Sequence, residues 1–301
     1  MKYNWVSLIG KFVQDEEIIR FGGGTVDYEG SPYPAIGTYI CDQQFSGGTI
    51  SADIKFSSID DDSTCEIIAN FDPALRSLLN VGIGGGTMYA IRHFGNTWTN
   101  LVSIGDRSNM EPNRSYKVCV ELSGSRLSLS VDNVQVAVAT VPLFLPQGQV
   151  GIWTRGRSDI EISNYHVIAE RPKIFVIMQF SSPYNEIYRN VLKIVCDDLN
   201  LQAIRADETT GPGLIIADVE REIIESRAVI AEITPANPNV FYEVGFAHAI
   251  NKPTILLAEK GTQLPFDVSP FRVLFYENSI SGKGALEEGL RNHLSAVLHA
   301  V

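Results

Sequence analysis

The sequence predicts two domains of different fold class: an all-β sandwich followed by an α/β domain with a doubly wound parallel sheet. Up to about Ala169, short segments alternate between apolar and polar residues and are separated by turn residues, as in antiparallel strands. From Pro172 onward, continuous apolar runs alternate with segments of helical periodicity. The length of 301 residues also favours two domains. We place them at residues 1–170 and 171–301.

The first half is predicted to be a sandwich of the jelly-roll type, because many short strands follow one another with turns between them. Its clearest hairpin is RLSLSVDNVQVAVA, where Leu127, Leu129 and Val131 alternate before the turn residues Asp132 and Asn133. The glycine clusters FGGGT and GIGGGTM lie within this β pattern. We therefore expect them to form turns or bulges rather than phosphate-binding loops.

In the second half, strands and helices are expected to alternate. The expected strands contain KIFVIM, LQAIRAD, AVIAEI, PTILLAE and RVLFY, and the expected helices cover Pro183 to Leu199, Gly213 to Ser226, a segment starting at Asn237, and a C-terminal segment with Leu286 and Leu290. Each helical segment carries its apolar residues on one side. This alternation predicts a parallel sheet with helices on both faces.

Composition narrows the range of partners and compartments. The formal net charge is −11 and neither half is basic, so we do not expect a nucleic-acid partner. The segment MKYNWVSLIGKFVQDEE lacks the core of a signal peptide, and no stretch is long enough to span a membrane. The four cysteines form no CxxC pair, and the acidic run Asp60, Asp61 and Asp62 is expected to be a solvated loop. We predict a cytoplasmic protein without a metal site or a membrane partner.

Ligands of a doubly wound sheet bind beyond the carboxyl ends of its strands, where the strand order reverses. The candidates that this rule selects are Gln179, Phe180 and Ser181 after the first strand, Arg205 and Asp207 after the second, and Glu232 at the end of the third. Glu243 belongs to the helix after that third strand.

The segment NPNVFYEVGFAHAINKP places a carboxylate at the edge of an apolar helix face. Asn237 is a suitable N-cap, and the following proline suits the first helical position. The residues expected to face the sheet are Val240, Val244 and Ala247. Glu243 lies about 100° round the helix from its neighbour Val244, so its carboxylate can reach the cleft. Burying an unpaired carboxylate is costly, so Glu243 is expected to reach solvent from the edge of the helix, to pair with Arg205 or Arg272, or to serve the site's function.

The order of KIFVIMQF, IRADE, AVIAEITPANPNVFYEVGFAHAINKPTILL and PFDVSPFRVLFY resembles bacterial nucleoside 2-deoxyribosyltransferase-like domains, which are close in fold to Toll/interleukin-1 receptor (TIR) domains. The resemblance covers about residues 172 to 278 and implies a flavodoxin-like, TIR-like sheet. It implies that Glu243 attacks or stabilises the anomeric carbon of a nucleoside, or of the nicotinamide riboside half of NAD. The residues then expected to bind substrate are Gln179, Phe180, Ser181, Arg205, Asp207, Glu232 and Asn239. Among these we expect Arg205 at a phosphate and Asp207 and Glu232 at ribose.

Two departures from the transferase pattern favour hydrolysis over transfer between bases. Members of this superfamily tend to carry aspartate at the end of the third strand and an acidic residue six positions before the glutamate; here Glu232 and Asn237 stand there. Breaking the bond from C1′ to nitrogen builds positive charge on the ribose, which a nearby carboxylate stabilises or captures. Nicotinamide leaves as a neutral molecule and needs no acid, so NAD suits a site with one strong carboxylate.

The segment PQGQVGIWTRGRSDIEISNYHVIAE resembles the closing strands of concanavalin-like or laminin-G-like sandwich domains. This resemblance implies a carbohydrate or protein partner for the first half. Trp98 and Trp153 could stack on a sugar, although packing is the more common role of tryptophan.

The leading hypothesis is a cytoplasmic, homo-oligomeric hydrolase of an N-glycosidic bond in NAD or a related nucleotide. NAD is then a substrate and no cofactor is needed, and the resemblance implies a role as an effector of bacterial antiviral defence. One alternative is a catalytically silent module that binds a nucleotide and relays the signal through the sandwich. Others are a nucleoside deoxyribosyltransferase and a carbohydrate-directed protein that acts through its first half.

Overall fold

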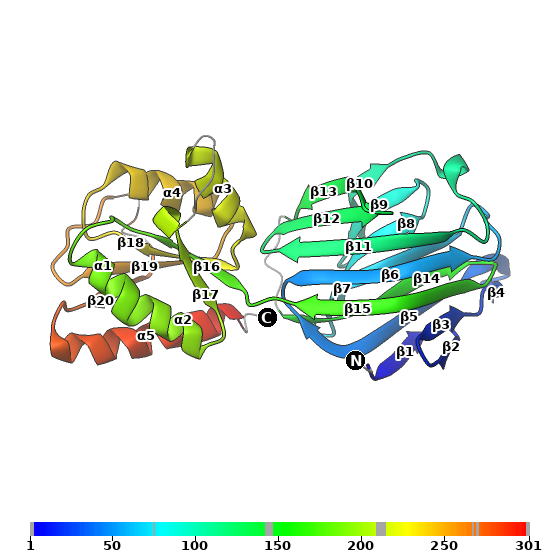
Figure 1. Cartoon of the computed structure of the whole chain (residues 1–301), viewed down its shortest axis with the longest axis horizontal. Helices are drawn as coiled ribbons and strands as arrows, with labels where there is room; N and C mark the ends of the chain where they lie inside the picture. The colour runs from blue at the N-terminus through cyan, green and yellow to red at the C-terminus, as the bar shows by residue number, and fades with distance from the viewer. Residues whose placement is uncertain are drawn as a thin grey trace.

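The computed structural model describes residues 3–74, 76–141, 147–208, 215–266, 268 and 271–298. It contains an antiparallel β-sandwich and an α/β domain, arranged side by side along the long axis of the molecule (Figure 1). The chain passes from the last sandwich strand, β15 (Ile160–Ala169), into the first parallel strand, β16 (Lys173–Ile177).

Two antiparallel sheets form the sandwich, which confirms the prediction of an all-β first half. The first sheet contains β1 (Trp5–Ile9), β4 (Thr25–Tyr28), β5 (Ser31–Phe45), β7 (Thr64–Asp72), β8 (Ser77–Gly84), β9 (Tyr89–Phe94), β10 (Trp98–Ile104) and β14 (Gly148–Gly156). The second contains β2 (Phe12–Asp15), β3 (Ile18–Phe21), β6 (Gly48–Phe56), β11 (Ser115–Ser123), β12 (Arg126–Val131), β13 (Val134–Thr140) and β15. The orders are β1-β5-β14-β7-β8-β9-β10, with β4 on β5, and β13-β12-β11-β6-β15-β3-β2.

Alternation of side chains builds the sandwich core. In β6, Ile50, Ala52, Ile54 and Phe56 are buried, whereas the residues between them are partly exposed. The predicted hairpin is formed by β12 and β13, and its turn residues have the positive φ angles that a two-residue hairpin turn requires, 51° and 67°. The glycines of the GIGGGTM cluster end β8 and lead into β9, as expected for a turn.

The second domain is a parallel sheet covered by helices on both faces. Its strands are β16, β17 (Gln202–Arg205), β18 (Ala228–Glu232), β19 (Thr254–Glu259) and β20 (Val273–Tyr276), in the order β17-β16-β18-β19-β20. Its α-helices are α1 (Tyr184–Ile187), α2 (Lys193–Asp198), α3 (Ile215–Glu225), α4 (Pro238–Ala249) and α5 (Ile280–Leu298). A π-helical turn, Tyr188–Leu192, joins α1 to α2, so the helix predicted from Pro183 is continuous.

Two hydrophobic clusters show which helices cover which face. Residues of α1, α2 and α5 pack with Ile174, Val176 and Ile230 on one face of the sheet. Residues of α3 and α4 pack with Phe175 and Ile177 on the other. The strand order reverses beside β16, where β17 and β18 lie on opposite sides of it, so a crevice is expected at the carboxyl ends of these strands.

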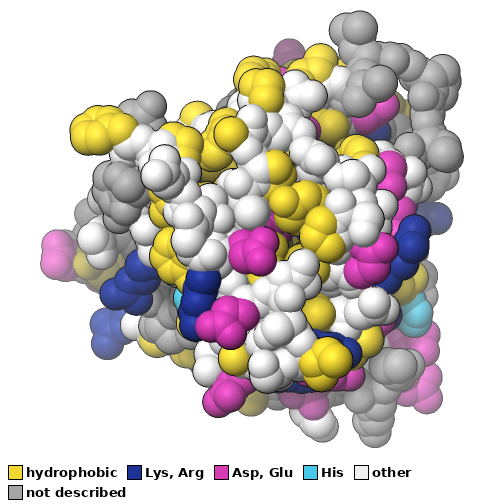
Figure 2. Space-filling model, turned by 90° about the vertical axis from the view of Figure 1, so that its left-hand side faces the viewer, with side chains coloured by type: hydrophobic (Ala, Val, Ile, Leu, Met, Phe, Trp, Pro, Cys, Tyr) yellow, Lys and Arg dark blue, Asp and Glu magenta, His cyan; other side chains and the backbone are white. Residues whose placement is uncertain are grey.

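The carboxyl ends of the parallel strands point away from the sandwich. A space of about 370 Å³ between the domains is lined by Gln44 and Gln147 of the sandwich and by Pro172, Leu201 and Arg227, which lie next to the starts of β16, β17 and β18. Figure 2 therefore shows the opposite end of the α/β domain, where hydrophobic side chains and carboxylates lie together. In the described residues, no helix is long and apolar enough to cross a membrane.

Candidate functional site

A cavity of about 690 Å³ lies between α3 and α4, beyond the carboxyl ends of β16 and β17. The described residues that line it are Met178, Gln179, Phe180, Ala206, Ile216, Val219, Asn237, Asn239, Val240, Tyr242 and Glu243. Its volume is typical of small-molecule sites, and its lining combines apolar side chains with a few amides and one carboxylate.

The start of α4 is fixed by its cap. The side chain of Asn237 accepts a hydrogen bond from the backbone N–H of Asn239 at 3.0 Å, as predicted for an N-cap. Val240, Val244 and Ala247 are buried against the sheet, which confirms the predicted apolar face. This register turns Glu243 toward the cavity.

The carboxyl group of Glu243 makes no hydrogen bond and no ion pair with any residue that the structure describes. Burial raises its pKa to about 7, and no cation among the described residues opposes this effect. The alternative that Glu243 pairs with Arg205 or Arg272 is therefore wrong. A carboxyl group with a pKa near neutrality can act as a nucleophile, a general base or an acid, depending on the pH.

Three predicted substrate-binding residues share the cavity with Glu243. They are Gln179, Phe180 and Asn239. Phe180 is 50% exposed, so its ring is available to a ligand. The side-chain amide of Gln179 donates to Ser181 Oγ at 2.8 Å, so Ser181 orients Gln179 and is not among the lining residues.

Arg205 and Asp207 are placed differently from the prediction. The Arg205 side chain is buried, and its guanidinium donates to both carboxylate oxygens of Asp207 at 2.6 Å and to Asn185 Oδ1 at 2.7 Å. It also stacks on the rings of Tyr188 and Phe180. These contacts occupy the guanidinium, so the structure corrects our expectation of a phosphate contact: Arg205 supports Phe180 from behind.

Glu232 is also separated from the cavity. It is fully buried, and its Oε1 accepts hydrogen bonds from Tyr276 Oη at 3.0 Å and from the backbone N–H and hydroxyl of Thr234. Its side chain lies on the face covered by α1 and α5, because it follows Ile230 by two residues in β18. Glu243 lies on the other face, so the expected contact of Glu232 with the same ribose is not supported.

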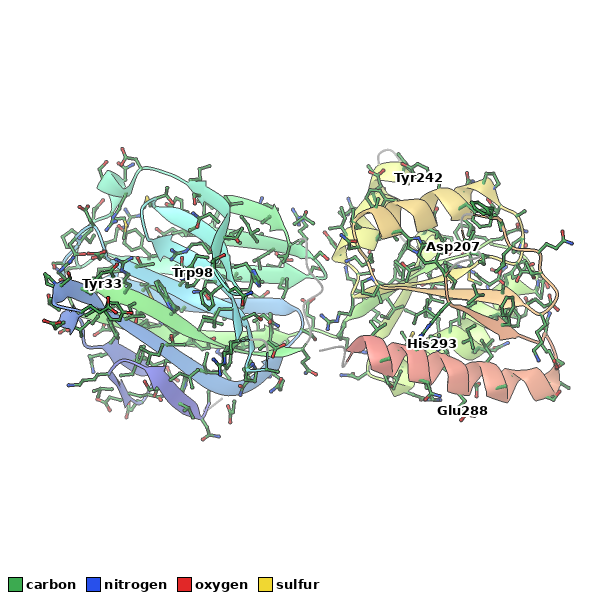
Figure 3. All side chains as sticks on the ribbon, turned by 180° about the vertical axis from the view of Figure 1, so that it is seen from behind. Tyr33, Trp98, Asp207, Tyr242, Glu288 and His293 are labelled. Carbon is green, nitrogen blue, oxygen red and sulfur yellow. The ribbon has the colours of Figure 1, made fainter. Side chains whose placement is uncertain are left out.

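Helix α3 forms a wall of the cavity that was not predicted from the sequence. Ile216 and Val219 line the cavity from this helix, and Tyr242 Oη donates to Glu220 Oε1 at 3.1 Å across the two helices. Figure 3 shows Tyr242 at the outer edge of the domain and Asp207 nearer its middle. The sequence pattern could have identified Ile216 and Val219. They lie about one helical turn apart in the helix after β17, and such residues flank the crevice at the carboxyl end of that strand.

The sandwich holds a second cluster of polar and aromatic side chains, on the outer side of its first sheet. Arg92 stacks on Trp98 and Trp153 and forms an ion pair with Glu66 at 2.5 Å. Trp153 is buried, whereas Trp98 is 40% exposed at the surface (Figure 3). Trp153 is thus a packing residue, and the exposed face of Trp98 remains open to a partner. No described group of His, Cys, Asp and Glu side chains is arranged to hold a metal ion.

The fold and the cavity define a two-domain protein in which a β-sandwich precedes a parallel α/β domain with a carboxyl-bearing cavity. Comparisons with protein-family models and with curated proteins gave no match. Solved structures give matches that fit the sandwich. The carbohydrate binding module CBM66 from Bacillus subtilis is 13% identical, with a TM-score of 0.44, and the match covers 54% of this chain and 92% of the module.

A β-glucanase from Bacillus licheniformis is 12% identical, with a TM-score of 0.38 and coverage of 56% of this chain and 95% of the glucanase. A structure described as a native glycosidic hydrolase gives 12% identity, a TM-score of 0.38 and coverage of 54% and 87%. At these identities and TM-scores, the likeness carries no argument about a ligand or an activity.

Proposed function

We propose that the protein hydrolyses an N-glycosidic bond in NAD or a related nucleotide, with Glu243 as the carboxylate that acts at C1′ of the ribose. One observation carries this proposal: the Glu243 carboxyl group is unpaired within the described residues and lines a cavity of about 690 Å³ at the reversal point of a parallel sheet. The carboxyl group is half-buried and has lost part of its hydration, so a ligand that pairs with it would offset this cost.

The rest of the cavity suits a nucleotide. Phe180 offers an exposed aromatic face to a base, and Gln179 and Asn239 supply amide groups that can bind ribose hydroxyls. The cationic nicotinamide ring of NAD would favour the ionised form of Glu243 when bound, because an opposite charge lowers the pKa of a carboxyl group.

The reaction follows from these placements. The bond from C1′ to the nitrogen breaks with its electron pair going to the base, and the carboxylate of Glu243 stabilises or captures the positive ribose. Water then adds to C1′ and releases a proton, leaving free base and the hydrolysed sugar. The strand order β17-β16-β18-β19-β20 supports the flavodoxin-like and TIR-like arrangement on which the substrate class depends. Assembly as a homo-oligomer and a role in antiviral defence are parts of this proposal that rest on family resemblance alone.

Mass spectrometry of small molecules incubated with the protein tests this proposal. Wild type should release nicotinamide from NAD or a base from a related nucleotide, and Glu243→Gln should lower the rate by at least about 100-fold. Glu220→Gln is the matched control, because Glu220 contacts Tyr242 beside the cavity yet is not a lining residue. Failure of wild type to consume NAD or any nucleoside, at concentrations that also allow assembly, would refute the enzyme hypothesis.

A binding function is the second candidate, and the pKa of Glu243 favours it specifically. With a pKa of about 7, a large part of the population carries a neutral carboxyl group that can donate a hydrogen bond to a ligand. A sensor would be stabilised thermally by a nucleotide without forming product. That stabilisation should persist in Glu243→Gln, whose amide can donate as well.

A further inference from the structure

Helix α3 connects the cavity to the sandwich. Ile216 and Val219 line the cavity, whereas Ile224 and Glu225, at the other end of the helix, contact the turn between β11 and β12. The helix is roughly 16 Å long. Figure 1 shows it on the side of the α/β domain that meets the sandwich. Because a helix of this length is stiff, a shift at its sandwich end moves the cavity wall.

The β11–β12 turn caps the end of α3. The backbone N–H of Ser125 donates to the carbonyl of Ile224 at 3.0 Å, and Ser123 Oγ contacts the carbonyl of Glu225 at 3.4 Å. The guanidinium of Arg126 lies 3.7 Å from the Glu225 carboxylate. The last carbonyls of a helix have no partner within the helix, so the sandwich supplies donors that α3 itself lacks.

Lys252 links the C-terminal end of α4 to the contact between α3 and the β11–β12 turn. Its backbone N–H donates to the carbonyl of Ala247 in α4 at 2.8 Å. Its Nζ donates to Ile224 O at 2.8 Å, to Ser226 O at 2.7 Å and to Ser125 Oγ at 2.8 Å. Burial lowers the pKa of Lys252 to about 7, and its N–H groups satisfy carbonyls at the end of α3 that have no partner within the helix. One residue thus joins the ends of both helices that enclose the cavity, through its backbone at α4 and through its side chain at α3.

Gly124 makes the fit of the turn close. Its φ is +56°, and a Cβ atom there would lie 2.3 Å from the carbonyl carbon of Glu225 and 2.6 Å from the carbonyl oxygen of Ser226. Both are backbone atoms, so they cannot move aside as a flexible side chain could. Any side chain at this position therefore separates the turn from α3.

We propose that the β11–β12 turn and Lys252 are positioning elements of the candidate site, which hold the C-terminal ends of α3 and α4 and thereby set the width of the cavity between them. This goes beyond the proposed function, because it applies to any ligand of the cavity. The sandwich is then a structural part of the site. A conformational change in the β11–β12 turn would move α3 and thereby change the surroundings of Glu243.

Gly124→Ala in the full chain tests the proposal without touching the cavity. The matched control is Gly30→Ala, which also introduces a Cβ at positive φ, +80°, in the sandwich but meets nothing within 4 Å. Hydrogen–deuterium exchange of residues 216–225 should become at least about tenfold faster in Gly124→Ala and stay unchanged in the control.

Titration of Glu243 then shows whether the cavity itself has changed. Carbon-13 NMR of labelled glutamate should give a pKa for Glu243 at least half a unit closer to its ordinary value in Gly124→Ala, because a looser wall admits water. If the protein turns over a substrate, kcat/KM should fall at least about fivefold in Gly124→Ala and not in Gly30→Ala. Lys252→Met should give the same changes in exchange, in the pKa of Glu243 and in kcat/KM. It replaces Gly124→Ala as the test if that variant does not fold.

Two results would overturn the proposal. One is unchanged exchange in α3 in both Gly124→Ala and Lys252→Met. The other is faster exchange in α3 with an unchanged pKa of Glu243. That result would mean that the contacts of the β11–β12 turn and Lys252 stabilise α3 without setting the shape of the cavity. A wild type that consumes no substrate would refute the proposed hydrolysis alone, since the exchange and titration results still decide this inference.

Discussion

Glu66 in the sandwich is a fully buried carboxyl group and Glu243 in the α/β domain is a half-buried one, and the two also differ in their partners. Glu66 is fully buried; its Oε1 accepts from Arg92 Nε at 2.8 Å, and its Oε2 accepts from the side-chain amide of Asn80 at 3.2 Å. Glu243 has no such partner in the described part of the chain. Burial raises the pKa of both groups, and only at Glu66 do a cation and an amide oppose it.

This difference separates a carboxylate that stabilises the fold from one that remains free to act. The hydrogen-bonding capacity of Glu66 is used by Arg92 and Asn80, so a ligand could bind it only by displacing them. The capacity of Glu243 is left for a ligand. Each of the two assignments can be tested by changing the group or its partner.

The largest effect is expected at Glu66. Arg92→Met should lower the free energy of unfolding by about 3–5 kcal/mol, because it leaves a buried carboxylate without its cation. Urea denaturation at pH 7 measures this cost, and the activity per folded molecule should stay the same. The control is Arg114→Met, whose exposed pairs with Glu111 and Asp132 should contribute little. Equal effects of the two substitutions would show that Glu66 does not depend on Arg92.

Replacing the Glu243 carboxylate is expected to raise the free energy of unfolding, whereas Arg92→Met lowers it. The pKa is about 7 in the folded state and about 4.3 in the unfolded chain, so the folded state binds more protons between these values. Stability from this group is therefore present below about pH 4 and lost as the pH rises through about 7. Since solvent reaches part of the group, we expect Glu243→Gln to be more stable than wild type by about 1–2 kcal/mol at pH 8.

The difference between Glu243→Gln and wild type should vanish near pH 4, where the wild-type carboxyl group is neutral in both states. Urea denaturation at the two pH values measures it, with Glu220→Gln as the control for loss of a nearby carboxylate. A Glu243→Gln variant less stable than wild type at pH 8 would show that the carboxylate has a stabilising partner in the protein.

The pH dependence of turnover follows from the same pKa. If the ionised carboxylate acts at C1′, kcat/KM should rise with pH and level off above about pH 7, and it should fall about tenfold per unit below about pH 6. A sensor that uses the neutral carboxyl group would instead lose affinity for its ligand as the pH rises through about 7. Steady-state kinetics and ligand titration from pH 5 to 8.5 distinguish the two.

Local patterns in the sequence predicted the elements and the direction of Glu243. The cap at Asn237 and the buried series from Val240 to Ala247 fix the register of α4, and these signals lie within one short segment. The alternation of strands and helices likewise predicted the parallel sheet, because connections of this kind leave few other topologies.

The sequence could not show which face of the sheet each candidate occupies. Strands such as β18 are buried on both faces and read as continuous apolar runs, so no alternation indicates the side of Glu232. The pairing of Arg205 with Asp207 and Asn185 depends on the short 3₁₀ helix Ala206–Glu208 after β17 and on a residue of α1. Contacts of this kind arise from tertiary packing, and residue spacing does not encode them.

The smallest effect is expected from removing the N-cap of α4, which tests how strongly this cap fixes the position of Glu243. Asn237→Ala removes the acceptor for the Asn239 N–H and should cost about 1 kcal/mol of stability, whereas Asn237→Ser keeps a capping oxygen and should recover most of it. Because the first turn of α4 carries Asn239 and precedes Glu243 closely, fraying there should raise KM more in the alanine variant than in the serine variant. Thermal unfolding and steady-state kinetics of the pair measure both effects. If the two variants differ in stability but share one KM, the packing of Val240 and Val244 alone holds Glu243 in place.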